Sequence, residues 1–338
     1  MKKKVVTLGE ILLRLSPPDN KRIINSTVFD VNYGGAETNV AVNLSLLGIS
    51  TAVVTKVPDN ELGNAALRHL RGFGVNTDNI AVGGERIGSY FLENGFSTRN
   101  SKVIYDRKNS SFSNATINDF DFDFIFKDVS LFHVSGVTLG LNSKICDLAE
   151  YFMKEAKTRG ITVSFDFNYR SKLWTLEEAA VSIKKVLKYV DITFAGYLDF
   201  TNILGMKTTR DYSEEERIEC YKELYPKVMA EYGFKYIVSS IRKTISASEN
   251  KYKGIAYDGK EIFVSKEYNI EIVDRVGSGD SFTSGFLFAY LEEKNNQYKV
   301  EFAAASATLK HTIFGDVNLV SKSEVESLFE KDSFDVVR

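Results

Sequence analysis

Short apolar runs alternate with longer segments of helical apolar spacing over most of this chain. The runs predict buried strands, and the segments whose apolar residues recur every three or four positions predict helices. Strands are expected at residues 5–8, 51–57, 129–134, 162–167, 191–194 and 236–240, and helices at 36–48, 61–73, 143–158, 176–188, 281–293 and 300–312. Strands that alternate with helices form a mostly parallel sheet covered on both faces, so the fold class expected is three-layer α/β/α.

Two intervals rich in strand-like residues, 11–33 and 87–113, interrupt this alternation. In the second, residues 89–93 and 102–107 read as paired strands around a polar turn. Ligands bind beyond the carboxyl ends of the strands in an open α/β sheet, so a small second sheet there would form a lid. The main domain would then comprise residues 1–10, 34–86 and 114–338.

Two features of the second half of the chain complete the expected organisation. Residues 208–218 are charged and predict an exposed connection. Strand-like pieces follow at residues 244–248, 252–257 and 261–265. The sequence shows no internal repeat.

Composition narrows the classes of partner. The 338 residues include 43 Lys and Arg against 45 Asp and Glu, a net charge of −2, which favours neither a nucleic-acid nor a membrane surface. No apolar run is long enough for a signal peptide or a membrane span. Two isolated cysteines, Cys146 and Cys220, fit neither a disulfide framework nor a zinc site, and predict a reducing cytoplasm.

The most informative stretch lies near the C-terminus and reads Asp274-Arg275-Val276-Gly277-Ser278-Gly279-Asp280. A glycine-rich turn that leads into a helix leaves backbone N–H groups free to bind an anion, most often phosphate. Asp280 would be repelled by a phosphate, unless it acts as the general base for a hydroxyl that attacks that phosphate. The stretch lacks the patterns of a P-loop, a Rossmann fingerprint and a serine-hydrolase elbow.

Two further clusters suit a polyhydroxylated ligand. Gly34 and Gly35 would let the backbone approach a ligand closely, and Asn39, one helical turn on, can both donate to and accept from a hydroxyl. The alternative is a plain tight turn before a helix. In the lid, strand alternation places Tyr105 and Arg107 on one face with Tyr90 near, unless that face is simply exposed.

A third cluster follows the strand at 162–167. Alternation places Asp166, Asn168 and Arg170 on one side, and an arginine at a strand's carboxyl end suits a carboxylate or a phosphate. The alternative is a structural ion pair between Arg170 and Asp166.

These residues resemble the PfkB (ribokinase-like) carbohydrate kinases. Gly34-Gly35-Ala36-Glu37-Thr38-Asn39 and the stretch from Asp274 to Asp280 are similar to the two signatures of that family, and the resemblance covers essentially the whole chain. It implies ATP-dependent phosphorylation of a sugar hydroxyl with Mg²⁺, Asp280 as the general base, and the amides of Gly277, Ser278 and Gly279 as an anion hole. It also implies a candidate monovalent cation (K⁺) site near Asp274 and a homodimer contact through the lid.

Within the family, the chain looks most like the sugar-acid branch, the 2-keto-3-deoxygluconate (KDG) kinases. The stretches 9–12, 103–107, 166–174 and 315–316 carry that similarity. It implies that the primary hydroxyl of KDG is phosphorylated to the 6-phosphate. Residues expected to contact the sugar are Gly34, Gly35, Asn39, Tyr90, Tyr105, Arg107, Asn168, Arg170 and Asp316.

Three departures from the family pattern concern the nucleotide side. Arg275 replaces a usually small residue. Gly196-Tyr197-Leu198-Asp199 replaces an Asn-x-x-Glu motif linked to Mg²⁺. The usual glycine-rich nucleotide turn is replaced by residues 241–244; the ATP contacts expected there and at the anion hole are Ser240, Arg242, Lys243, Gly277 and Gly279.

Two alternatives to a KDG kinase remain open at this point. One is a fructokinase- or ribokinase-like enzyme that phosphorylates a neutral sugar. The other is a non-catalytic regulator that binds a sugar or a nucleotide on the same fold. The intact Asp280 disfavours the regulator, because a protein that only binds gains nothing from an acid beside a phosphate.

Overall fold

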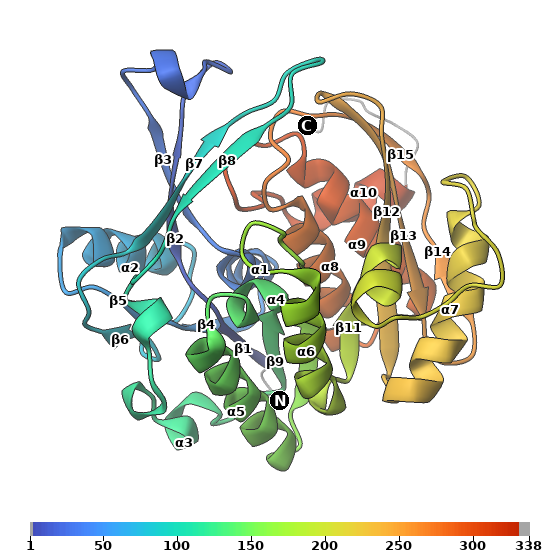
Figure 1. Ribbon diagram of the computed structural model, residues 1–338, viewed down its shortest axis with the longest axis horizontal. Coiled ribbons are helices and arrows are strands. Elements are labelled where there is room, and N and C mark those ends of the chain that lie inside the picture. Colours follow the sequence, from blue (N-terminus) through green and yellow to red (C-terminus); the bar gives the residue numbers. More distant parts are fainter. Residues whose placement is uncertain (1–2, 331–338) are drawn as a thin grey trace.

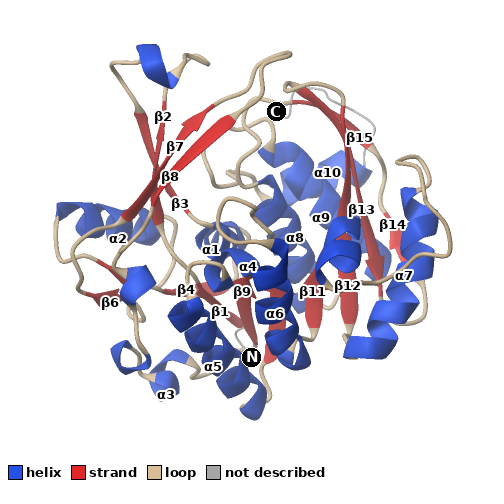
Figure 2. Cartoon of the chain, viewed as in Figure 1, coloured by secondary structure: helices blue, strands red, loops and turns tan. Residues whose placement is uncertain are grey.

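A computed structural model describes residues 3–330 and shows a three-layer α/β/α domain with a separate small sheet (Figures 1 and 2). The central sheet has nine strands in the order β14-β13-β12-β11-β10-β9-β1-β4, with β15 paired to β13. Its strands are β1 (Lys4–Leu8), β4 (Ser50–Val54), β9 (Leu131–Ser135), β10 (Thr162–Asp166), β11 (Ile192–Phe194), β12 (Tyr236–Thr244), β13 (Glu249–Tyr257), β14 (Ile262–Val264) and β15 (Tyr268–Glu271). The strands from β4 to β12 are parallel, and β13 turns antiparallel.

Alternation along the parallel strands builds two apolar cores. On β9, Phe132 and Val134 face one core while Leu131 faces the other. The first core is covered by α5 (Ser143–Thr158), α6 (Leu176–Val186) and α7 (Arg217–Tyr232), and the second by α1 (Ala36–Leu46), α8 (Ser278–Leu291), α9 (Asn296–Lys310) and α10 (Lys322–Glu330). Helices therefore cover both faces of the sheet, which confirms the predicted fold class.

The remaining elements lie at the edge near β4 and in short connections. They are α2 (Glu61–Gly72), α3 (Phe122–Ile125), α4 (Gly136–Leu139), and the short strand pair β5 (Lys56–Val57) and β6 (Ala81–Val82). Cys146 and Cys220 are buried and unpaired. Between residues 3 and 330, no helix has the length and apolar character needed to cross a membrane.

The separate small sheet, for which we keep the name lid, has four strands in the order β3-β2-β7-β8. Its strands are β2 (Leu12–Ser16), β3 (Asp30–Gly34), β7 (Gly88–Glu93) and β8 (Lys102–Asp106), and they rise beside the main domain in Figure 1. The pairing sets side chains in rows across the four strands. One row, Asn32, Arg14, Tyr90 and Tyr105, belongs to the face that contains the buried Arg14 and Tyr90; the next row, Val31, Leu15, Phe91 and Ile104, belongs to the opposite face.

The structure differs from the predicted elements at several points. Residues 245–248 are the turn of the β12–β13 hairpin, not part of a strand. Strand β10 ends at Asp166, so strand alternation does not continue to Arg170. Helix α8 begins at Ser278, three residues before the predicted start. Helices α7 and α10 were not predicted, and α7 begins inside the segment expected as a connection.

Candidate active site

The N-terminus of α8 is built around a glycine that no other residue can replace without strain. Gly277, the residue before the helix, has φ of 78°, and a Cβ there would lie 1.9 Å from the main-chain oxygen of Asp316. The backbone N–H of Val276 donates to Asp274 Oδ1 at 3.0 Å, and the Ser278 hydroxyl donates to the oxygen of Arg275 at 2.9 Å. The turn is therefore fixed, with the first N–H groups of α8 at its open end, where an anion is favoured.

Asp280 lies on the first turn of α8 and is held by the first glycine-rich motif. Asn39, one turn into α1, donates from Nδ2 to Asp280 Oδ2 at 2.7 Å and accepts from the Gly35 N–H at 3.3 Å. Burial raises the pKa of Asp280 to about 7, although the Asn39 hydrogen bond and Arg170 both lower it. A carboxyl that titrates near neutrality, beside the N-terminus of a helix, has the properties of a general base.

The two glycines before α1 permit close packing against the late loops. A Cβ on Gly34 would lie 2.5 Å from Asp316 Oδ1, and a Cβ on Gly35, whose φ is 156°, would lie 2.2 Å from the oxygen of Glu10. The backbone of the turn that begins α1 therefore packs closely against Glu10, just before lid strand β2, and against the Asp316 side chain.

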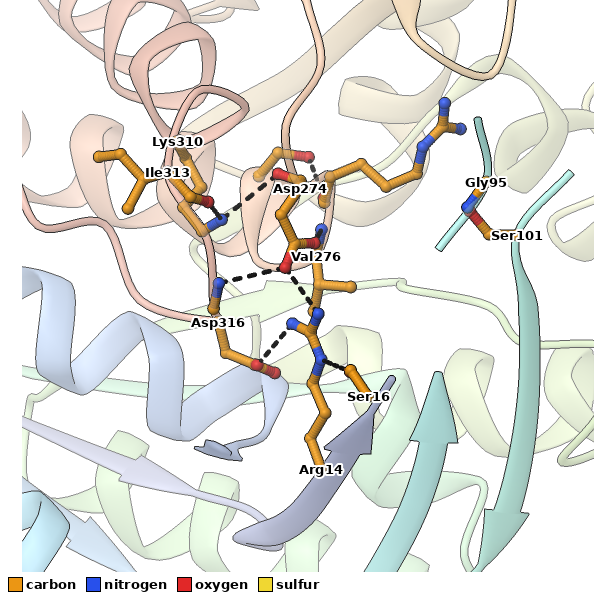
Figure 3. A network of polar contacts seen from close by, with 12 residues as sticks. Arg14, Ser16, Gly95, Ser101, Asp274, Val276, Lys310, Ile313 and Asp316 are labelled. Carbon is orange, nitrogen blue, oxygen red and sulfur yellow. Dashed lines mark hydrogen bonds and ion pairs between the residues drawn. The ribbon is translucent and has the colours of Figure 1, made fainter. Parts of the chain in front are cut away.

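A buried network joins the lid to the loops around α8 (Figure 3). Arg14, on lid strand β2, donates from Nη1 to Asp316 Oδ2 at 2.9 Å and from Nη2 to Asp274 Oδ2 at 2.6 Å. The Tyr90 hydroxyl donates to Asp316 Oδ1 at 2.7 Å. Burial lowers the pKa of Arg14, but the two carboxylates more than offset this and leave it raised. Arg14 is therefore a permanent cation that connects the lid with the loop before α8, residues 274–277.

Arg107 is buried and has a carboxylate partner. Its Nε donates to Glu10 Oε2 at 2.7 Å, and the Ser110 hydroxyl donates to Glu10 Oε1. The Arg107 guanidinium carbon lies 6.0 Å from the centre of the Tyr105 ring, and the Tyr105 and Tyr90 rings are 6.1 Å apart. The structure thus brings the three predicted lid residues together, and burial of Arg107 excludes the exposed-face alternative for it.

Arg170 presents the opposite case, an exposed cation without a bound acid. Within residues 3–330 it has no ion pair, which removes the alternative of a structural pair with Asp166. It nevertheless lies close enough to lower the pKa of Asp166, Asp199 and Asp280. Asn168 has φ of 38°, and its N–H donates to Asp166 Oδ1 at 3.0 Å, which turns the chain after β10.

Asp166 and Asp199 form an acidic edge beside Asp280. Burial, with the charges of Asp280 and Asp199, raises the pKa of Asp166 to about 8. Burial also raises the pKa of Asp199 to about 6, although the hydrogen bond that it accepts from the Gly196 N–H at 2.7 Å lowers it. Asp199 stands where the Glu of the Asn-x-x-Glu motif would be, so a carboxylate is retained there on a shorter side chain.

The pfkB family carbohydrate kinase pattern matches residues 2–322. This chain belongs to that family. A 2-dehydro-3-deoxygalactonokinase of Haloferax volcanii is 29% identical over 326 residues, 96% of each chain. The crystal structure of a 2-dehydro-3-deoxygluconokinase of Thermotoga maritima is 45% identical, has a TM-score of 0.93, and is matched over 97% of this chain and 99% of that one.

A fructokinase of Xylella fastidiosa with bound ATP has a TM-score of 0.76 at 20% identity, over 98% of this chain and 99% of that one, which shows the shared fold. The chain is therefore a carbohydrate kinase, a phosphotransferase with an alcohol group as acceptor. Its similarity to 2-dehydro-3-deoxygluconokinases, another name for KDG kinases, confirms the resemblance that the sequence indicated.

Arg275, which the sequence left unexplained, contacts the turn between β12 and β13. Arg275 donates from Nη2 to the oxygen of Ala247, at the β12–β13 turn, at 2.9 Å. The N–H of Ala247 donates to the oxygen of Ser97, at the tip of the lid, at 2.8 Å. The Ser97 N–H in turn donates to the Ser248 hydroxyl at 2.8 Å. Arg275 therefore connects the loop before α8 to the point where the lid tip meets the main domain.

The predicted ATP contacts on β12 differ from one another in their surroundings. Lys243 pairs with exposed Glu215 at 2.8 Å. Arg242 has no ion pair within residues 3–330, and its charge helps burial to lower the pKa of Arg275. Two arginines close enough to repel each other near the loop before α8 favour an anion in their vicinity.

Sequence reasoning missed Arg14, Glu10 and Lys310. Arg14 did carry a signal: it shares one face of β2 with Leu12 and Ser16, where an arginine must be buried with partners. Its partners are 260 and 302 residues away, so they could not be read from the local pattern.

Proposed function

We propose that this kinase transfers the γ-phosphoryl group of ATP to the primary hydroxyl of a sugar acid, most specifically from KDG to its 6-phosphate. The observation that carries the proposal is Asp280, half-buried at the N-terminus of α8 and held by Asn39 at 2.7 Å. Asp280 takes the hydroxyl proton as the hydroxyl oxygen attacks the γ-phosphorus, and ADP leaves from the opposite side. The amides of Gly277, Ser278 and Gly279 stabilise the charge on the transferring group.

The sugar would lie between α1 and the lid. Gly34, Gly35 and Asn39 provide the floor, and Tyr90, Tyr105 and Asp316 the wall on the lid side. Arg170 is the cation proposed to bind the substrate carboxylate, because Glu10 already neutralises Arg107. Asn168 would position the segment that carries Arg170.

ATP would bind along β12 and the loop before α8, with Ser240, Arg242 and Lys243 as proposed contacts. Mg²⁺ neutralises the phosphates when it is bound with ATP. Within residues 3–330 no three acidic, His or Cys side chains form a metal-binding group, so the phosphates would supply most of its ligands. The acidic edge of Asp166 and Asp199 fits a cation brought in this way, because their mutual repulsion would fall.

An exposed apolar row supports a homodimer through the lid. The outer row of the lid contains Val31, which is 58% exposed, and Ile104, which is 55% exposed, with Leu15 and Phe91 between them. Ile104→Lys should yield a monomer in sedimentation, whereas Val181→Lys, at an exposed apolar site on α6, should leave the dimer intact.

The unpaired buried thiols suit a reducing compartment, and we place the reaction in the cytoplasm.

The decisive test measures ADP release with KDG, its C4 epimer, fructose and ribose as acceptors. KDG should give the highest kcat/KM, and Asp280→Asn should lower kcat by at least about 100-fold. Turnover by Asp280→Asn close to that of the wild type would refute the general-base assignment.

A neutral-sugar kinase is the second candidate, and the Glu10–Arg107 pair favours it because it removes one of the two cations expected for a sugar acid. Arg170→Ala separates the candidates. For a sugar-acid kinase it should raise KM for KDG about 10- to 100-fold while leaving fructose turnover unchanged. An equal loss with both sugars would refute recognition of a carboxylate by Arg170.

A further inference from the structure

Lys310, the last residue of α9, is fully buried. Its Nζ donates to the main-chain oxygen of Ile313 at 2.8 Å and lies 3.4 Å from that of Asp274 (Figure 3). Within residues 3–330 it has no ion pair with a carboxylate. Lysine is almost never fully buried unless it is paired, because burial of an uncompensated charge is costly. An ammonium that rests on main-chain oxygens therefore needs a reason.

The two oxygens belong to the segments that shape the N-terminus of α8. Asp274 begins the anion-binding turn, and Ile313 precedes Asp316, whose main-chain oxygen packs against Gly277. The Lys310 side chain runs beneath the same turn, since its Cε would lie 3.4 Å from a Cβ on Gly277. The ammonium thus bridges two loops that have no secondary structure of their own to hold them.

The monovalent cation site implied near Asp274 does not fit the residues present. Asp274 Oδ2 accepts from Arg14 at 2.6 Å and from the Gly315 N–H at 3.1 Å, and Oδ1 accepts from the Val276 N–H at 3.0 Å. Its main-chain oxygen faces the Lys310 ammonium. A K⁺ ion placed there would compete with these donors and would be repelled by two buried cations.

We infer that the Lys310 ammonium serves as a tethered monovalent cation, which positions the anion-binding turn and makes this kinase independent of added K⁺. The inference rests on the proposed anion hole at α8. Lys310 is a positioning residue, because it acts through the main chain of residues 274–277 and not on the substrate itself. Arg14 neutralises the Asp274 and Asp316 carboxylates from the lid side, and Lys310 holds the main chain from the α9 side.

The test compares the wild type with Lys310→Met in buffers that contain tetramethylammonium, Na⁺, K⁺ or NH₄⁺ at equal ionic strength. Wild-type kcat should change less than twofold among them. Lys310→Met should lose at least about 100-fold in kcat, as when an oxyanion-hole donor is removed, and K⁺ or NH₄⁺ should restore part of it. KM for the sugar should change little.

Lys299→Met is the matched control. Lys299 is also buried on α9, but its Nζ donates to Tyr236 Oη at 3.0 Å and Asn296 Oδ1 at 2.8 Å, away from the α8 turn. Its effects should not depend on the cation. Thermal unfolding without nucleotide gives a readout that does not require kinase activity: K⁺ and NH₄⁺ should raise the Tm of Lys310→Met specifically, and not that of the wild type or Lys299→Met.

Several results would overturn the inference. A wild-type enzyme that needs K⁺ would do so, as would full activity of Lys310→Met in tetramethylammonium. An inactive Lys310→Met that no cation rescues, in kcat or in Tm, would show that Lys310 only fills space. If no sugar is phosphorylated by the wild type, the proposed function fails, and the Tm comparison still decides the role of Lys310.

Discussion

Removal of Arg14 should weaken the fold far more than removal of an ordinary surface arginine. The Arg14 side chain is 2% exposed, and its partners Asp274 and Asp316 are 1% and 2% exposed. Arg14→Met keeps the apolar stem but leaves both carboxylates buried without a cation. Breaking a buried ion pair from one side costs about 3–5 kcal/mol, and here one change affects two acids. We therefore expect the free energy of unfolding to fall by at least that amount.

Urea unfolding, followed by far-UV circular dichroism and by fluorescence of Trp174, measures this loss. Arg86→Met is the matched control, because the Arg86–Asp106 pair of the lid has side chains 37% and 56% exposed. It should change the free energy of unfolding by less than about 1 kcal/mol. If Arg14→Met proves as stable as Arg86→Met, the buried network does not hold the lid to the main domain.

Three further predictions concern the first turn of α8 and the loop before it. With the pKa of Asp280 at about 7, kcat/KM should fall as pH drops through 7, because the base becomes protonated. The raised pKa also means that Asp280 destabilises the fold as pH rises, so Asp280→Asn should raise the Tm at pH 8. A kcat/KM that does not change with pH would contradict the first expectation, and an unchanged Tm would contradict the second. Gly277→Ala should cost about 1–3 kcal/mol of stability and most of the activity, whereas Gly72→Ala, where a Cβ meets nothing within 4 Å, should cost neither, as urea unfolding and turnover would show. Arg275→Ala should increase amide hydrogen exchange at residues 94–101 and 245–248, and unchanged exchange there would refute its role at the lid tip.

The sequence predicted those parts of the fold that depend on local pattern. Val5 to Leu8 and residues 129–134 read as buried strands because they are short and mostly apolar, and they form the greater part of β1 and β9. Residues 244–248 were predicted as a strand because Thr244 and Ile245 favour strands, but only Thr244 belongs to one, and residues 245–248 form the hairpin turn. Tertiary contacts decide where such a segment turns, and these are not visible in a short window.

The candidate site was predictable in its signatures and not in its buried charges. Two short motifs were recognisable from their residue types, one with Gly35 and Asn39 and the other with Gly277 and Asp280. The structure brings the two motifs into contact through the 2.7 Å hydrogen bond from Asn39 to Asp280. Lys310 lies in a helix whose other residues gave no sign of a special role. Its partners are main-chain oxygens, and no sequence pattern marks a main-chain oxygen.

The row arrangement of the lid limits how the lid can evolve. Residues that face the proposed sugar site and residues that face the proposed partner subunit alternate along the same strands, as Arg14 and Leu15 do on β2. Insertion of a single residue within β2 would turn every later side chain of that strand to the other face, exchanging its interior positions for its exterior ones. Changes in length should therefore accumulate at the connection between β7 and β8, residues 94–101, whereas the strands themselves should change only by substitution.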